Sequence, residues 1–141
     1  MNERLRARYQ DLVARARAAL VHAHAPYSDF RVGAAVIDDR GDIHVGVNVE
    51  NVSYGLTICA ERTAIFAAIA AGARRISAIA VTSAKERPIS PCGACRQVMA
   101  ELCDPAVEVV SEDPDGALVV WTVQELLPNS FASSALARGK A

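Results

Sequence analysis

Two short stretches decide how this chain is interpreted: Cys59-Ala60-Glu61-Arg62-Thr63-Ala64 and, later, Pro91-Cys92-Gly93-Ala94-Cys95-Arg96-Gln97. Each lies where a helix is expected to begin, since residues 59–71 are rich in alanine and residues 93–103 end before an Asp-Pro pair. The free N–H groups and the dipole at a helix N-terminus favour a thiolate, the form of cysteine that binds a metal ion. The two stretches therefore predict a zinc site held by cysteines.

The spacing of the cysteines favours a catalytic zinc site over a structural one. Cys92 and Cys95 lie on one face of a first helical turn, where they can chelate one ion, and Cys59 can supply a third thiolate from a neighbouring helix. Three protein ligands leave one tetrahedral position for water. Glu61, two residues after Cys59, is placed to take a proton from that water.

Two other uses of the cysteines remain open at this point. A Cys-x-x-Cys pair also occurs in redox proteins. A structural zinc would need Cys103 as a fourth ligand, but Cys103 lies about 12 Å beyond Cys95 along the same helix. We expect Cys103 to be an inert core thiol, and His22, His24 and His44 to be surface or packing residues.

Composition limits the possible functions. The 141 residues and 15.0 kDa suffice for one domain, and 27 of the residues are alanine, which buries little area. With 15 basic and 16 acidic residues and 5% aromatics, the chain has little to attract nucleic acid or stack its bases. No signal peptide or membrane span is visible, so we expect a cytoplasmic protein with reduced thiols and no membrane partner.

The pattern of the chain predicts an α/β fold with one mixed sheet of five strands and helices on its faces. Helices are expected at residues 3–24, 59–71, 93–103 and 122–127, and strands at residues 30–37, 43–48, 76–82, 107–110 and 118–121. Gly33 would let another element approach its strand closely. We expect a single domain over residues 1–131 and a frayed tail over residues 132–141.

The two cysteine stretches resemble those of the small homotetrameric zinc-dependent cytidine deaminases, within the wider cytidine/deoxycytidylate deaminase superfamily. Two further segments share the resemblance, Phe30-Arg31-Val32-Gly33-Ala34-Ala35 and Asn48-Val49-Glu50-Asn51. The resemblance covers residues 27–131, and the Asn-x-Glu-Asn segment narrows it to enzymes of free nucleosides. It implies a three-layer α/β/α fold with a mixed five-stranded sheet.

The resemblance also implies roles for single residues. One Zn²⁺ per subunit is bound by Cys59, Cys92 and Cys95, with Glu61 as catalytic proton shuttle and Arg62 bonded to the thiolates. The substrate is contacted by Phe30 at the pyrimidine ring and by Asn48 and Glu50 at the ribose hydroxyls, together with Ala60, Tyr54 and Phe131. Tyr54 and Phe131 match family positions at subunit boundaries. Val52 stands where alanine is more usual, and its bulk is expected to narrow the ribose side.

The expected reaction is hydrolysis of cytidine and deoxycytidine to uridine and deoxyuridine with release of ammonia, a step of pyrimidine salvage. Zinc-bound hydroxide attacks C4, and Glu61 carries protons to N3 and to the leaving amino group. The resemblance implies a homotetramer with shared sites. Three alternative functions remain open: a deaminase of another small nucleoside-like substrate such as a nucleoside antibiotic, a polynucleotide-editing deaminase, and a noncatalytic zinc module. The pair Asn48 and Glu50 argues against the first, and the near-neutral charge argues against the second.

Overall fold

The structure is a computed structural model that describes residues 1–136. Its five strands are β1 (Val32–Asp38), β2 (Ile43–Val47), β3 (Ile76–Ser83), β4 (Glu108–Glu112) and β5 (Leu118–Thr122). They form a sheet in the order β2-β1-β3-β4-β5, in which only the β3–β4 pair is parallel. The predicted mixed five-stranded sheet is confirmed.

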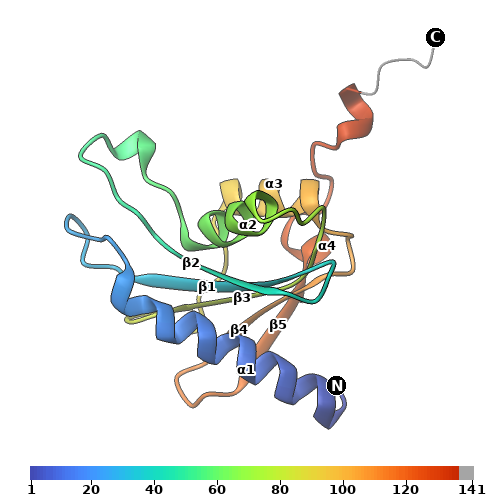
Figure 1. Cartoon of the computed structure of the whole chain (residues 1–141), viewed down its shortest axis with the longest axis horizontal. Coiled ribbons are helices and arrows are strands. Elements are labelled where there is room, and N and C mark those ends of the chain that lie inside the picture. The colour runs from blue at the N-terminus through green and yellow to red at the C-terminus, as the bar shows by residue number, and fades with distance from the viewer. Residues whose placement is uncertain (137–141) are drawn as a thin grey trace.

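Helices cover both faces of this sheet (Figure 1). The long helix α1 (Glu3–Ala19) lies on one face, and α2 (Ala60–Ala70) and α3 (Gly93–Leu102) lie on the other, with the short α4 (Val123–Leu126) beside α3. Three 3-10 turns complete the described chain: Leu20–His22, Tyr54–Leu56 and Ser133–Leu136. The three-layer α/β/α arrangement agrees with the prediction.

Several boundaries differ from the sequence prediction. The first helix ends at Ala19 and continues only as a 3-10 turn to His22, and the strand over residues 107–110 occupies Glu108–Glu112 instead. The strand expected from Phe30 begins at Val32, because side chains rather than a neighbouring strand bind the Phe30 backbone. Part of the tail expected to fray, Ser133–Leu136, forms a 3-10 turn, and residues 137–141 lie outside the described residues. The boundary at residue 131 between the domain and its tail stays a prediction.

The strands supply two cores because their side chains alternate between the faces. On β1, Val32, Ala34 and Val36 pack toward α2 and α3, whereas Ala35 and Ile37 pack toward α1. The core beneath α1 combines four alanines with larger side chains such as Tyr9, Leu12 and Ile37. The core beneath α2 and α3 also contains Ile79, Val81 and Met99, and it reaches the cysteines of the two helix starts.

Two glycines allow the helices to lie directly on the sheet. A Cβ at Gly33 would collide with the carbonyl oxygen of Ala16 in α1, which confirms the close approach expected at that strand. A Cβ at Gly46 in β2 would lie 2.7 Å from the Ala60 oxygen of α2 and nearer still to Thr63. The Thr63 hydroxyl donates to the Val47 oxygen at 2.8 Å, so α2 is also hydrogen-bonded to β2. On α2 the alanines that pack inward are Ala60, Ala64 and Ala68.

We expect Gly46→Ala to destabilise the fold by about 1–3 kcal/mol, since the added methyl group must push α2 away from β2. Gly55→Ala is the matched control, because a Cβ at Gly55 meets no atom of the described residues within 4 Å. Denaturant unfolding of the two variants measures the difference. Equal unfolding midpoints would show that α2 is not held by this contact.

Candidate metal centre

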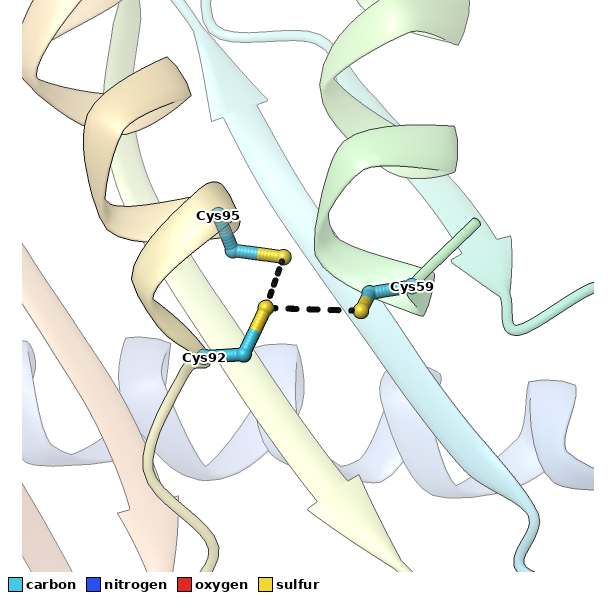
Figure 2. A group of neighbouring side chains, drawn as sticks. All are labelled: Cys59, Cys92 and Cys95. Atoms are coloured by element: carbon cyan, nitrogen blue, oxygen red, sulfur yellow. Dashed lines mark hydrogen bonds between the residues drawn. The ribbon is translucent and has the colours of Figure 1, made fainter. Parts of the chain in front are cut away.

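Three thiols converge where α2 and α3 begin, and Figure 2 shows their sulfur atoms turned toward one another. Cys59 is the N-cap of α2, Cys92 is the N-cap of α3, and Cys95 lies in the first turn of α3. The Cys92 Sγ lies 3.5 Å from the Sγ atoms of both Cys59 and Cys95, and all three lie within 4.8 Å of one another. The predicted grouping of these cysteines is therefore present in the fold.

The donor set fits a zinc ion. With Zn–S bonds of about 2.3 Å, tetrahedral geometry places two sulfur ligands about 3.8 Å apart, close to the separations between Cys92 and its two partners. Cys103 is not part of the group; its side chain is 3% exposed in the core, and burial raises the pKa of its thiol to about 12. The described residues thus offer three thiols to this site, which leaves room for a fourth, non-protein ligand.

Arg62 places a positive charge beside the thiols. Its Nη2 lies 3.4 Å from the Cys59 Sγ, while its Nε is buried without a hydrogen-bond partner among the described residues. The pKa of the Cys59 thiol is lowered to about 5, because the Cys95 thiol hydrogen-bonds to its sulfur and Arg62 adds a charged donor. Since three thiolates with Zn²⁺ carry a net charge of −1, the guanidinium would offset that charge.

Glu61 is the buried acid of this centre. It lies in the first turn of α2 with 4% of its surface exposed, and burial raises the pKa of its carboxyl group to about 7. Its neighbours Cys59 and Ala60 line the same cavity. A carboxyl group with a pKa near neutrality can both accept and release a proton at that pH.

The cavity beside the cysteines has a volume of about 250 Å³. Its lining includes seven of the predicted site residues: Phe30, Asn48, Glu50, Cys59, Ala60, Glu61 and Cys92. Tyr54 instead lines an adjoining cavity of about 360 Å³, together with Tyr27, Ser28, Glu50 and Thr57. Arg62, Cys95 and Phe131 line neither cavity.

Within the described chain Val52 does not line the cavity, so its expected narrowing of the ribose side stays a prediction. Val52 is 76% exposed and lines neither cavity, because it lies on the loop between β2 and α2, which projects from the body of the molecule (Figure 1). Its side chain faces solvent rather than the space beside Asn48 and Glu50.

The polar residues of the cavity are bound mainly to backbone groups. Asn48 Oδ1 accepts from the Val32 N–H at 2.9 Å, and its Nδ2 donates to the Phe30 oxygen at 2.7 Å. Glu50 Oε1 accepts from the N–H groups of Tyr27 at 2.9 Å and Ser28 at 3.1 Å. The two side chains therefore fix the loop that carries Phe30.

Sequence reasoning missed several lining residues: Ser28, Thr57, Ile89 and Ser90. Ser28 lies in the stretch Pro26-Tyr27-Ser28-Asp29, which reads in the sequence as a helix breaker. Asp29 there adopts a left-handed backbone with a φ of 55°, a conformation that Asp tolerates better than most residues. A polar residue inside such a turn was the one available signal, and it is a weak one because turns commonly contain serine.

Arg96 and Gln97, which follow Cys95 on α3, bind backbone groups outside that helix. Arg96 donates to the Pro91 oxygen at 2.7 Å and to the Leu126 oxygen at 2.8 Å. Gln97 Nε2 donates to the Phe131 oxygen at 2.9 Å. The helix that carries two of the thiols therefore also holds the C-terminal segment.

We expect purified protein to contain one zinc ion per chain, measured by elemental mass spectrometry. Replacement of Cys59, Cys92 or Cys95 by alanine removes one of three thiolates and is expected to lower retained zinc at least tenfold. Cys103→Ala is the control, because that thiol lies outside the cluster. Zinc retained by all three variants, or lost only in the control, would contradict this ligand set.

Comparisons with known proteins agree with this geometry. The family model for the cytidine and deoxycytidylate deaminase zinc-binding region matches residues 6–111. The cytidine deaminase of Halalkalibacterium halodurans is 49% identical over 124 residues, which cover 88% of this chain and 94% of that protein. The cytidine deaminase of Sporosarcina psychrophila is 44% identical over 127 residues, covering 90% and 93% of the two chains.

A solved structure supports the same relationship at the level of the fold. The crystal structure of cytidine deaminase from Burkholderia pseudomallei matches with a TM-score of 0.81 and 48% identity, over 93% of this chain and all of that chain. Family match, sequence identity and fold therefore coincide over most of the sequence, and the chain belongs to the cytidine and deoxycytidylate deaminase family.

Proposed function

We propose that this protein is a zinc-dependent cytidine deaminase, which hydrolyses cytidine and deoxycytidine to uridine and deoxyuridine and releases ammonia in pyrimidine salvage. The observation that carries the proposal is the buried Glu61 carboxyl group, which lines one cavity with two of the clustered cysteines and with Phe30, Asn48 and Glu50. Relatives at 49% and 44% identity bear the name cytidine deaminase.

In this proposal Cys59, Cys92 and Cys95 would hold a zinc ion, which would supply a Lewis acid that makes a water molecule nucleophilic near neutral pH. Glu61 would take one proton from the attacking water and deliver it to N3 of the pyrimidine while the water oxygen bonds to C4. It would then move the remaining proton of that oxygen to the amino group, so that the C4–N bond breaks, ammonia leaves and a carbonyl group remains at C4. Its burial suits this role because a desolvated carboxyl group exchanges protons near neutral pH. Arg62 is a positioning residue that balances the charge of the thiolates.

The other lining residues suit a nucleoside. Phe30 is half-buried and offers an apolar ring beside the pyrimidine, Ala60 leaves space close to the thiols, and Asn48 and Glu50 offer polar atoms to the sugar. The net charge of −1 disfavours a polynucleotide substrate, because binding a phosphate backbone requires neutralising cations. The substrate is therefore a free nucleoside.

We expect Glu61→Gln to keep its zinc and to lose about 10²–10⁴-fold in kcat, since the amide cannot carry the proton. Ultraviolet absorbance of cytidine gives the rate, and elemental analysis gives the zinc content. Glu101→Gln, an exposed residue of α3, is the control and should retain full activity. Near-normal turnover by the Glu61 variant would refute the proposed role.

We further propose a cytoplasmic homotetramer in which neighbouring subunits complete each active site. Phe131 is 63% exposed and lines neither cavity of its own chain, and Tyr54 is 75% exposed. Phe66 and Ile69, three residues apart on α2, add exposed apolar surface that a second copy would cover. The free thiols of the metal centre suit a reducing compartment. Within residues 1–136, no helix is long and apolar enough to cross a membrane.

Sedimentation at micromolar concentration is expected to give a species near four times 15.0 kDa.

Phe131→Ala should raise the KM for cytidine, because a neighbour's pocket loses one wall, whereas Leu136→Ala, which changes another exposed residue, should not. Mixing Phe131→Ala chains with Glu61→Gln chains should create some sites with both intact groups, seen as a fraction of the activity that has the lower, wild-type KM. A stable monomer with full activity would contradict the shared site.

A further inference from the structure

The Ser28 hydroxyl joins two groups of the cavity that come from different segments. It donates to Glu50 Oε2, from the segment that follows β2, and accepts from the Phe30 N–H at 3.0 Å. The Ser28 backbone N–H donates to the other oxygen of the same carboxylate at 3.1 Å. Ser28 thus contacts both oxygens of Glu50 and the backbone of the aromatic residue beside them.

The direction of each bond follows from the chemistry of the partners. A backbone N–H can only donate, so the Phe30 N–H uses the hydroxyl oxygen as acceptor. An ionised carboxylate can only accept, so the Ser28 proton must point to Glu50. Because its two neighbours permit only this orientation, the hydroxyl does not rotate freely as an unbonded serine hydroxyl would.

These bonds leave the Glu50 carboxylate with few free positions. A carboxylate has about four lone-pair positions, two on each oxygen. Oε1 already accepts from the N–H groups of Tyr27 and Ser28, and Oε2 accepts from the Ser28 hydroxyl. One position on Oε2 remains for a ligand. Since Glu50 lines the cavity beside the thiols, that position is where a sugar hydroxyl can donate.

We propose that Ser28 is a positioning residue that sets sugar specificity by orienting Glu50 so that it offers a single acceptor position to the sugar. The inference rests on the proposed function, because it concerns how the same site distinguishes sugars. A ligand with a correctly placed hydroxyl donates to the remaining acceptor position of the Glu50 carboxylate. A sugar without that hydroxyl leaves a desolvated lone pair of the carboxylate unpaired.

The charge state of Glu50 agrees with this geometry. The pKa of its carboxyl group lies below its ordinary value, first because the Ser28 hydroxyl donates to it and then because the Tyr27 and Ser28 N–H groups do, against the opposing effect of burial. At neutral pH Glu50 is therefore an acceptor, which selects hydroxyl donors and rejects ligand groups that can only accept.

The test compares two nucleosides that differ only at the sugar, cytidine and 2′,3′-dideoxycytidine, which lacks both ring hydroxyls. For Ser28→Ala we expect the KM for cytidine to rise about tenfold with little change in kcat, the loss of one hydrogen bond to a charged group. Binding of the dideoxy compound, measured as KM or as competitive Ki, should change less than twofold. Ser28→Thr keeps the hydroxyl, on a residue that is exposed in this chain, and should restore the cytidine KM.

Ser53→Ala serves as the matched control. Ser53 lies on the loop between β2 and α2, and it donates to the Asn51 side chain through its backbone N–H rather than through its hydroxyl. An equal loss for both nucleosides, or no loss at all in Ser28→Ala, overturns the inference. So does a failure of Ser28→Thr to restore the KM. Failure of the proposed function looks different: wild-type protein would then release no ammonia from cytidine, before any variant is compared.

Discussion

The close approach of two helix N-termini is the constraint on which the centre depends. Cys59 and Cys92 are the N-caps of α2 and α3, so the separation of those two helix starts sets the separation of the sulfur atoms. A displacement of either helix by an ångström would change ligand distances that a zinc ion tolerates only within about 0.2 Å. The packing beneath α2 is therefore part of the chemistry of the site.

The part of the cavity away from the cysteines is held in place by hydrogen bonds rather than by helix packing. The loops that form the rest of the cavity are held by side chains that hydrogen-bond to backbone groups. Asn48 binds the backbone of Phe30 and Val32, and Glu50 binds the backbone of Tyr27 and Ser28. Such bonds replace strand pairing where β1 has not yet begun. They also use most of the hydrogen-bonding capacity of these residues before any ligand arrives, so the site is ordered by the same atoms that are proposed to recognise the sugar.

Alanine serves close packing in this protein. Ala60 and Ala64 lie against the sheet at the place where β2 has Gly46, and Thr63 bonds to β2 from the same helix. On the opposite side of the sheet, the oxygen of Ala16 lies against Gly33. Short distances between backbones take the place of large side chains, and apolar residues such as Phe66 remain outside on α2.

The sequence alone determined the local elements and the ligand chemistry. Periodicity and turn residues identified each strand and helix to within a few residues, and two cysteine stretches at helix starts predicted a three-thiol group that is present in the fold. The boundary at Phe30 was wrong because it depends on Asn48 and Ser28, residues that local periodicity cannot connect to it. The exposure of Val52 in the single chain likewise depends on the path of a projecting loop, which its sequence neighbours do not specify.

Only the tertiary structure decided which atoms are in contact. The burial of Glu61 depends on a cavity that several segments enclose. The bonds from Tyr27 and Ser28 to both oxygens of Glu50 join residues more than twenty positions apart in the sequence. Residue types and spacing specify what a side chain can do, because that is covalent chemistry and local geometry. Its pKa, its partners and its remaining hydrogen-bonding positions depend on long-range packing, which no single stretch of sequence contains.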